Sequence, residues 1–324
     1  MRQKNFGVAV ALVFCALGLV AGVATAVDVP ALPTVSYADF SDIDAALAAQ
    51  GVNARLYMVE YTTRPDSGQY GGYILARNVG NKQLTAHWVP NDPRRREDDG
   101  DRYITYAIDG VDLYVNPGLD GASVIGAIDS AMGTWEDVSC STIPIVKVDD
   151  YGLDLGYVQF LLGYGGVPGW LADITHAGWP PVEFFAELFG TAATNVIGVT
   201  FTFIWVDDVS GDPTDVDGNG KQDVAFREIY YNNNFLWSLD GPAWNDDEID
   251  VETIVLHETG HGLSQAHFGK VFIDASDKEP PYSVSHLHFS PRAVMNAVYW
   301  DTRRELLGTD VGGHCSIWSA WPLK

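Results

Sequence analysis

Residues 257–267 read HETGHGLSQAH and hold three of the eight histidines of this 324-residue chain. Before them, Val251, Ile254 and Val255 recur at helical spacing, and Asp250 is suited to cap a helix N-terminus. The stretch is therefore predicted to begin inside a helix. His257 and His261 are four residues apart, so both imidazoles leave the same helical face and can bind one metal ion.

Glu258 and His267 extend this pair to a complete site. Glu258 lies next to His257, within reach of a water on the same metal, which is the H-E-x-x-H arrangement in which the glutamate acts as general base. His267 can return as a third ligand if the chain turns sharply after Gly262. Three nitrogen ligands leave a fourth zinc position open for water, as a catalytic site requires, whereas structural zinc sites favour four closed ligands.

The spacing of these residues resembles the signature of the metzincin metalloproteases, H-E-x-x-H-x-x-G-x-x-H. His257, Glu258, His261 and His267 match it, and Ser264 replaces the glycine of the turn. This substitution bears on the turn geometry rather than on the ligands.

Further residues resemble the matrixin branch of that family, and the resemblance covers about residues 102–324. Met295 stands where the family has its Met-turn, and Tyr299, four residues on, is a candidate for the wall of the substrate pocket. Thr309 and Asp310 resemble the start of the family's C-terminal helix. The resemblance implies an α+β catalytic domain with a twisted mixed β-sheet, an active-site helix and a Met-turn.

Three segments are predicted along the chain. Residues 1–26 have the basic start, apolar stretch and Ala-Thr-Ala end of a secretory signal peptide, with a retained membrane anchor as the alternative. Residues 27–100 are predicted to form a β-rich pro-region or accessory domain, and residues 101–324 the catalytic domain. The charged stretch 91–101, with Arg94, Arg95 and Arg96, reads as a linker that a trypsin-like protease can cut, or as an exposed loop within one domain.

Local patterns predict the regular elements that surround the site. Apolar residues at helical spacing between Val124 and Trp135 indicate an amphipathic helix. The segments expected to be strands are 55–63, 70–76, 102–108, 157–162, 196–205 and 226–231. The family resemblance makes 199–205 the sheet edge to which an extended peptide substrate adds.

An aspartate-rich loop lies between the last two strands. Asp215, Asp217, Asn219 and Asp223 place oxygen ligands at nearly alternate positions with glycines between them, a pattern by which short loops bind calcium. We expect structural calcium there, and the alternative is an acidic turn without an ion.

Composition limits the partners and the compartment. The formal net charge of −24 argues against binding to nucleic acid or anionic membranes. Cys140 and Cys315 are the cysteines left after removal of the signal peptide, and in an exported protein they predict one disulfide, with two buried thiols as the alternative.

Together these features predict a zinc-dependent endopeptidase that is secreted, to the extracellular space or the periplasm, and that acts on protein or peptide substrates. Glu258 would serve as its general base. Two alternatives stay open. One is an exported binding or adhesive module that metal ions stabilise without turnover, and the other is a hydrolase of non-peptide amides.

Overall fold

The structure is a computed structural model. It describes residues 41–63, 83–95, 102–116, 118–240, 248–273, 287–299 and 301–322. The expected signal peptide, residues 1–26, and the expected strand at 70–76 lie outside these ranges. Within them, no helix is long and apolar enough to cross a membrane.

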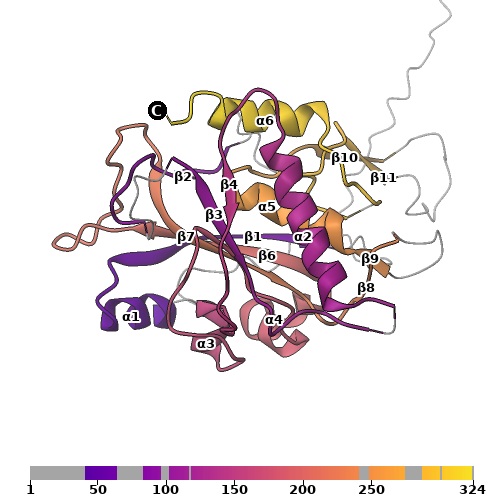
Figure 1. Cartoon of the computed structure of the whole chain (residues 1–324), viewed down its shortest axis with the longest axis horizontal. Helices are drawn as coiled ribbons and strands as arrows, with labels where there is room; N and C mark the ends of the chain where they lie inside the picture. Colours follow the sequence, from indigo (N-terminus) through magenta and orange to yellow (C-terminus); the bar gives the residue numbers. More distant parts are fainter. Residues whose placement is uncertain are drawn as a thin grey trace, which may run out of the picture.

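A seven-stranded mixed sheet forms the centre of the fold (Figure 1). Its strand order is β1-β6-β7-β5-β3-β4, with the short β2 pairing with β7. β3, β4, β5 and the adjoining part of β7 run parallel, whereas β6 is antiparallel to both β1 and β7. The strands are β1 (Ala54–Thr63), β2 (Ala86–His87), β3 (Ile104–Ile108), β4 (Ile145–Lys147), β5 (Ile174–His176), β6 (Val196–Trp205) and β7 (Gln222–Tyr231).

Helices cover both faces of the sheet, so β6 is buried along its whole length. Phe201 and Phe203 of β6 face one apolar core, which also holds side chains of α1 (Ser41–Ala49), α3 (Tyr157–Leu162) and α4 (Val182–Phe189). The other face packs against α2 (Gly121–Glu136) and α5 (Val251–Gly262). A short 3-10 helix, η2 (Gly190–Thr194), leads into β6.

The remaining elements lie around α5. They are the paired strands β8 (Leu236–Ser238) and β9 (Glu248–Asp250), the hairpin β10 (Lys270–Ile273) and β11 (Leu287–Ser290), and the C-terminal helix α6 (Gly308–Trp318). β9 leads directly into α5, so the start of that helix is fixed to a strand.

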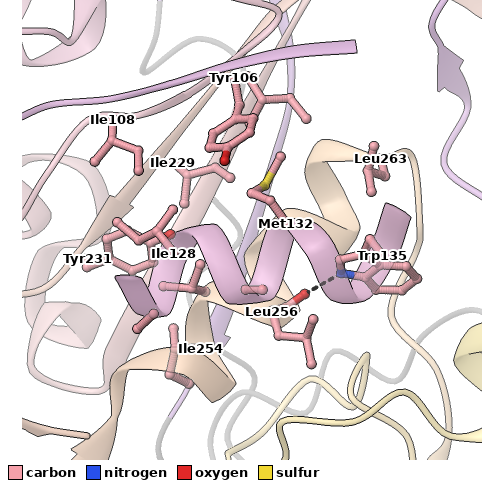
Figure 2. Close-up of a cluster of buried hydrophobic side chains, with 14 of the residues drawn as sticks. Tyr106, Ile108, Ile128, Met132, Trp135, Ile229, Tyr231, Ile254, Leu256 and Leu263 are labelled. Carbon is pink, nitrogen blue, oxygen red and sulfur yellow. Dashed lines mark hydrogen bonds between the residues drawn. The ribbon is translucent and has the colours of Figure 1, made fainter. Parts of the chain in front are cut away.

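α2 packs across α5 and fixes its position. Ile128, Met132 and Trp135 line the buried side of α2, as the sequence periodicity predicts (Figure 2). The indole Nε1 of Trp135 donates a hydrogen bond of 2.9 Å to the backbone oxygen of Leu256, on the turn of α5 that precedes His257. This bond joins the two helices one residue before the first predicted ligand.

Most of the predicted elements are confirmed, and one is wrong. Residues 157–162 form the helix α3 rather than a strand. A six-residue apolar run does not distinguish the two by periodicity. The helix is selected at its ends: the amides of Tyr157 and Val158 donate to the buried carboxylate of Glu228, and Gly163 ends the helix in the left-handed conformation.

A second correction concerns the edge of the sheet. β6 does not lie at an edge, because β1 pairs with it from Ala54 opposite Trp205 to Thr63 opposite Val196. Leu56 and Tyr61 of β1 are buried in the same core as Phe201. An extended peptide therefore finds the outer side of β6 already paired.

The charged stretch that begins at residue 91 is not an exposed linker in its described part, residues 91–95. The guanidinium of Arg95 is buried in an ion pair with Asp173, with Nε 2.8 Å from Oδ1. Arg94 binds Asp92 and Asp223. The boundary at residue 100 and the removal of residues 27–100 stay predictions, but a protease would have to pull Arg95 out of the core to cut beside it.

The predicted disulfide is confirmed: Cys140, shortly after α2, is bonded to Cys315 in α6. Such bonds persist in oxidising compartments. The pairing ties the C-terminal helix to the helix that supports α5.

Candidate metal centre

α5 carries the first two predicted ligands, His257 and His261, on its buried face. The Asp250 carboxylate caps this helix by accepting the amide of Thr253 at 2.9 Å. Both histidine rings are almost fully buried.

The sharp turn after the helix is made by Ser264 itself. Its φ is +68°, the left-handed conformation that glycine adopts most easily. The amide of Gln265 then donates to the carbonyl of Gly260 at 2.8 Å, which closes the turn. The Ser264 hydroxyl lies 2.9 Å from Nη1 of the buried Arg227, which also binds the carbonyl of Gly262. A serine therefore suffices to bring His267 back to α5.

The three histidine side chains converge through their Nε2 atoms. Nε2 of His267 lies 3.2 Å from Nε2 of His257 and 3.1 Å from Nε2 of His261. Nitrogens bound tetrahedrally to zinc at about 2.0–2.1 Å stand roughly 3.3 Å apart. The three residues therefore fit one zinc ion.

The opposite ring nitrogens determine which nitrogen of His257 and of His261 carries the proton. Nδ1 of His257 lies 2.7 Å from the carbonyl of Val294, and Nδ1 of His261 lies 2.8 Å from that of Gln265. Because a carbonyl only accepts, each Nδ1 carries the proton and each Nε2 of these two neutral rings presents a lone pair. Burial lowers the pKa of His257 to about 4 and that of His261 well below its usual value, so both rings stay neutral ligands at pH 7.

Glu258 follows His257 on α5, and both of its carboxylate oxygens accept hydrogen bonds. Thr62 of β1 donates to Oε1 at 2.8 Å, and Thr200 of β6 donates to Oε2 at 2.7 Å. Burial raises the pKa of this carboxyl to about 8 in the metal-free chain, and a bound cation would favour the carboxylate again. Gly198 leaves the space that Glu258 needs, since a Cβ there would lie 2.9 Å from Oε1.

Met295, the residue predicted to form a Met-turn, packs against α5 at Gly260. A Cβ on Gly260 would overlap its Sδ, so this glycine lets the Met-turn approach α5. The buried carboxylate of Asp310 accepts the amides of Val294 and Met295 at 2.9 and 3.1 Å. These bonds fix the turn that supplies the carbonyl partner of His257.

Tyr299 lines a cavity of about 20 Å³ beside His257, together with Thr62 and Val298. A cavity of that size holds about one water molecule. The Tyr299 hydroxyl accepts the amide of Asp250 at 3.2 Å, so this ring is fixed at the start of α5.

β1 covers the site. Glu60 places a carboxylate oxygen 3.3 Å from Nδ1 of His267, without hydrogen-bond geometry. Thr63 bridges in parallel to Val298, and its carbonyl accepts the amide of Tyr299 at 3.0 Å. The end of β1 thus runs between β6 and the segment after the Met-turn, and Glu258 is fully buried beneath it.

The aspartate loop lies apart from this centre, between β6 and β7. Carboxylates of Asp215, Asp217 and Asp223 lie within 4.8 Å of one another. Asp223 is already bound by the Arg94 guanidinium at 2.8 Å, and Asp215 accepts backbone amides of the loop, including that of Asn219. The Asn219 side chain donates to Asp217 rather than presenting its oxygen there. Hydrogen bonds and a cation of the protein itself close this loop, so the structure gives no support for calcium in it.

Several residues of the centre escape the sequence motifs. Thr62, Thr200 and Glu60 come from strands far from α5 in the chain, and nothing in their local pattern marks them. Gly198 and Gly260 carry a weak signal, because a glycine inside a strand or helix often marks a close approach.

No protein-family model matches this chain, and no match was found among the curated proteins. The functional argument therefore rests on the residues of the site.

Proposed function

We propose that the protein is a secreted zinc endopeptidase of metzincin type. The observation that carries this proposal is the convergence of three neutral imidazoles at distances that suit tetrahedral zinc. The buried Glu258 follows the first of these histidines, His257, in the chain. The disulfide and the signal-like residues 1–26 support an oxidising compartment outside the cytoplasm.

The chain supplies the proton transfers of peptide hydrolysis. A zinc ion on the triad would polarise the scissile carbonyl and lower the pKa of an attacking water. Glu258, the chain neighbour of His257, would take a proton from that water and return it to the leaving amine. Thr62 and Thr200 orient its two oxygens, so the basic lone pairs point in fixed directions.

The direction of β1 indicates how a peptide would lie in the site. Residues 60–63 run antiparallel to β6 and reach the Met-turn segment at Val298 in parallel. A substrate bound by strand addition would need this track, so it would compete with β1. In this proposal β1 occupies the substrate position of the newly folded protein. β1 must therefore be displaced, or cleaved by the protein itself, before an external substrate can bind.

The same closure favours a second candidate function, a metal-stabilised module without turnover. Glu258 and His261 are fully buried, and the cavity next to His257 has room for about one water. A zinc ion enclosed in this way would hold β1, α5 and the Met-turn together. The two functions differ in whether β1 ever leaves the site.

A matched pair of variants separates them. The full chain, loaded with one equivalent of zinc, is compared with Glu258→Gln and with the control Glu252→Gln. Glu252 lies on the same helix, but its carboxylate binds Ser130 and Arg304. Casein and a peptide library report external cleavage, and N-terminal sequencing reports cuts within β1. Zinc content is measured in parallel.

Wild type and Glu252→Gln are expected to cleave, and a zinc chelator should stop both. Glu258→Gln should keep its zinc and lose about 10²- to 10⁴-fold in rate, the usual contribution of a general base. If the zinc-loaded wild type cuts neither added peptides nor its own β1, the endopeptidase proposal is wrong and the metal-stabilised module stands.

A further inference from the structure

A second group of carboxylates lies at the carboxyl end of β3, away from the histidine triad. Asp109 and Asp112 follow β3 directly, and Asp154 comes from the loop before α3. Each offers an oxygen, and these three oxygens lie within 4.8 Å of one another. No sequence motif marks this group, because its members come from two separate segments.

The hydrogen bonds of the group leave oxygens unused. Asp109 is fully buried; its Oδ1 accepts the amide of Val111 at 2.7 Å, while its Oδ2 has no partner. Oδ1 of Asp154 is also buried without a partner. Buried carboxylate oxygens are rarely left this way, since each forfeits the hydrogen bonds that it had in water.

The buried amide of Gln159, on α3, belongs to the same group. Its Nε2 donates to Asp112 and, at 2.9 Å, to the carbonyl of Tyr164, which fixes the orientation of the amide. Its Oε1 is left buried without a donor. Gly165 packs against the group, since a Cβ there would lie 2.8 Å from Asp154 Oδ2 and 3.0 Å from Gln159 Nε2.

Charge points in the same direction. Burial, and then the neighbouring Asp112 and Asp154, raise the pKa of Asp109 to about 7, and no cation among the described residues offsets this effect. The aspartate loop differs here, because Arg94 binds Asp223. The Asp109 group is thus a cluster of carboxyl groups that no cation among the described residues balances.

We propose that Asp109, Asp112 and Asp154 bind a calcium ion. Oxygens bound at about 2.4 Å to one ion stand at most about 4.8 Å apart, so one ion can reach an oxygen of each of these three carboxylates. An all-oxygen donor set suits a hard cation and not zinc. Calcium accepts six to eight ligands in irregular geometry, so water and nearby carbonyl oxygens can complete its shell.

The ion would join parts of the chain that are far apart in sequence. It would fasten the turn after β3 to the loop and helix of residues 154–165, whose α3 binds Glu228 of β7. This role does not depend on proteolysis. It requires only that the folded protein binds calcium at these carboxylates.

The test uses the full zinc-loaded chain, freed of calcium, and measures calcium binding by calorimetry and by the unfolding temperature. Asp109→Asn and Asp154→Asn are the test variants, and Asp154 is only partly buried, so its variant should fold. The control is the double variant Asp215→Asn/Asp217→Asn, which removes two carboxylates from the aspartate loop.

At a hundredfold excess of calcium over its Kd, the unfolding temperature of wild type should rise by about 5 to 10 °C. Asp109→Asn and Asp154→Asn should each weaken binding at least tenfold, and the control should bind as wild type does at this site. The proposal is overturned if wild type binds no calcium, or if Asp154→Asn binds normally while the aspartate-loop control does not.

Discussion

The turn that brings His267 back to α5 can be tested with two substitutions of Ser264. Ser264→Ala and Ser264→Gly both remove the hydroxyl that lies 2.9 Å from Arg227 Nη1. Only the glycine variant also relieves the backbone, whose φ is +68°. Comparing the two variants therefore separates the hydrogen bond from the backbone conformation.

The expected magnitudes follow from these two terms. A hydrogen bond to a buried charged group contributes about 1.5–3 kcal/mol, which both variants lose. The left-handed conformation destabilises the folded state by roughly 1–2 kcal/mol for a residue with a Cβ, and glycine avoids this cost. Glycine also has more conformational entropy in the unfolded state, which lowers the free energy of unfolding by about 0.5–1 kcal/mol and offsets part of the gain. The free energy of unfolding should fall in the order wild type, Ser264→Gly, Ser264→Ala, with the last two about 0.5–1 kcal/mol apart.

Urea unfolding of the metal-free protein measures this order, and competition with a chromophoric chelator measures the zinc affinity of each variant. The affinity should follow the same order, because the turn places His267. Equal stability of the two variants would show that the backbone conformation is not a constraint. An alanine variant as stable as wild type would show that the contact with Arg227 contributes nothing.

Three further outcomes are expected. Replacing Cys140 and Cys315 by serine removes a cross-link with a sequence separation of 175 residues, and should lower the free energy of unfolding by about 5 kcal/mol on the chain-entropy estimate; a loss below about 1 kcal/mol in denaturant would contradict this. Asp173→Asn leaves the buried Arg95 without its ionic partner and should cost about 3–5 kcal/mol, with faster trypsin cleavage at Arg95; an unchanged digestion rate would refute this. Because the pKa of Asp109 is raised from 3.8 to about 7, the folded calcium-free protein binds the extra proton between these values, so stability should fall as pH rises from about 4 to 7. In Asp109→Asn the unfolding temperature should depend less on pH between about 4 and 7. An unchanged pH dependence would contradict the raised pKa of Asp109.

The elements that sequence periodicity predicts best are those with one buried face and a recognisable end. α2 repeats its apolar residues from Val124 to Trp135, and Asp250 caps α5 as expected. The candidate metal ligands on α5 are predictable for the same reason, since helical spacing alone places His257 and His261 together. The return of His267 followed from the family signature and not from local pattern.

Other features depend on contacts that no local pattern contains. α3 is a helix partly because Glu228, on another element, accepts its first amides. Thr62 binds Glu258, which is 196 residues away in the sequence. β1 pairs with β6 in a register that no local sequence pattern predicts. Asp109 and Asp154 are brought together in the same way. The functional side chains of α5 can therefore be predicted from the sequence, whereas the residues that contact them can be identified only from the tertiary structure.

The disulfide creates a difference in how the residues of the candidate metal centre are covalently connected. Cys140 and Cys315 close a ring of chain that contains all three histidines, Glu258 and Met295. A single cut within the ring leaves these groups in one molecule until the disulfide is reduced. β1, with Glu60 and Thr62, lies outside the ring on a single backbone connection. One cut between β1 and α2 would therefore turn the segment over the metal centre into a separate peptide, whose release would be governed by its own dissociation rate.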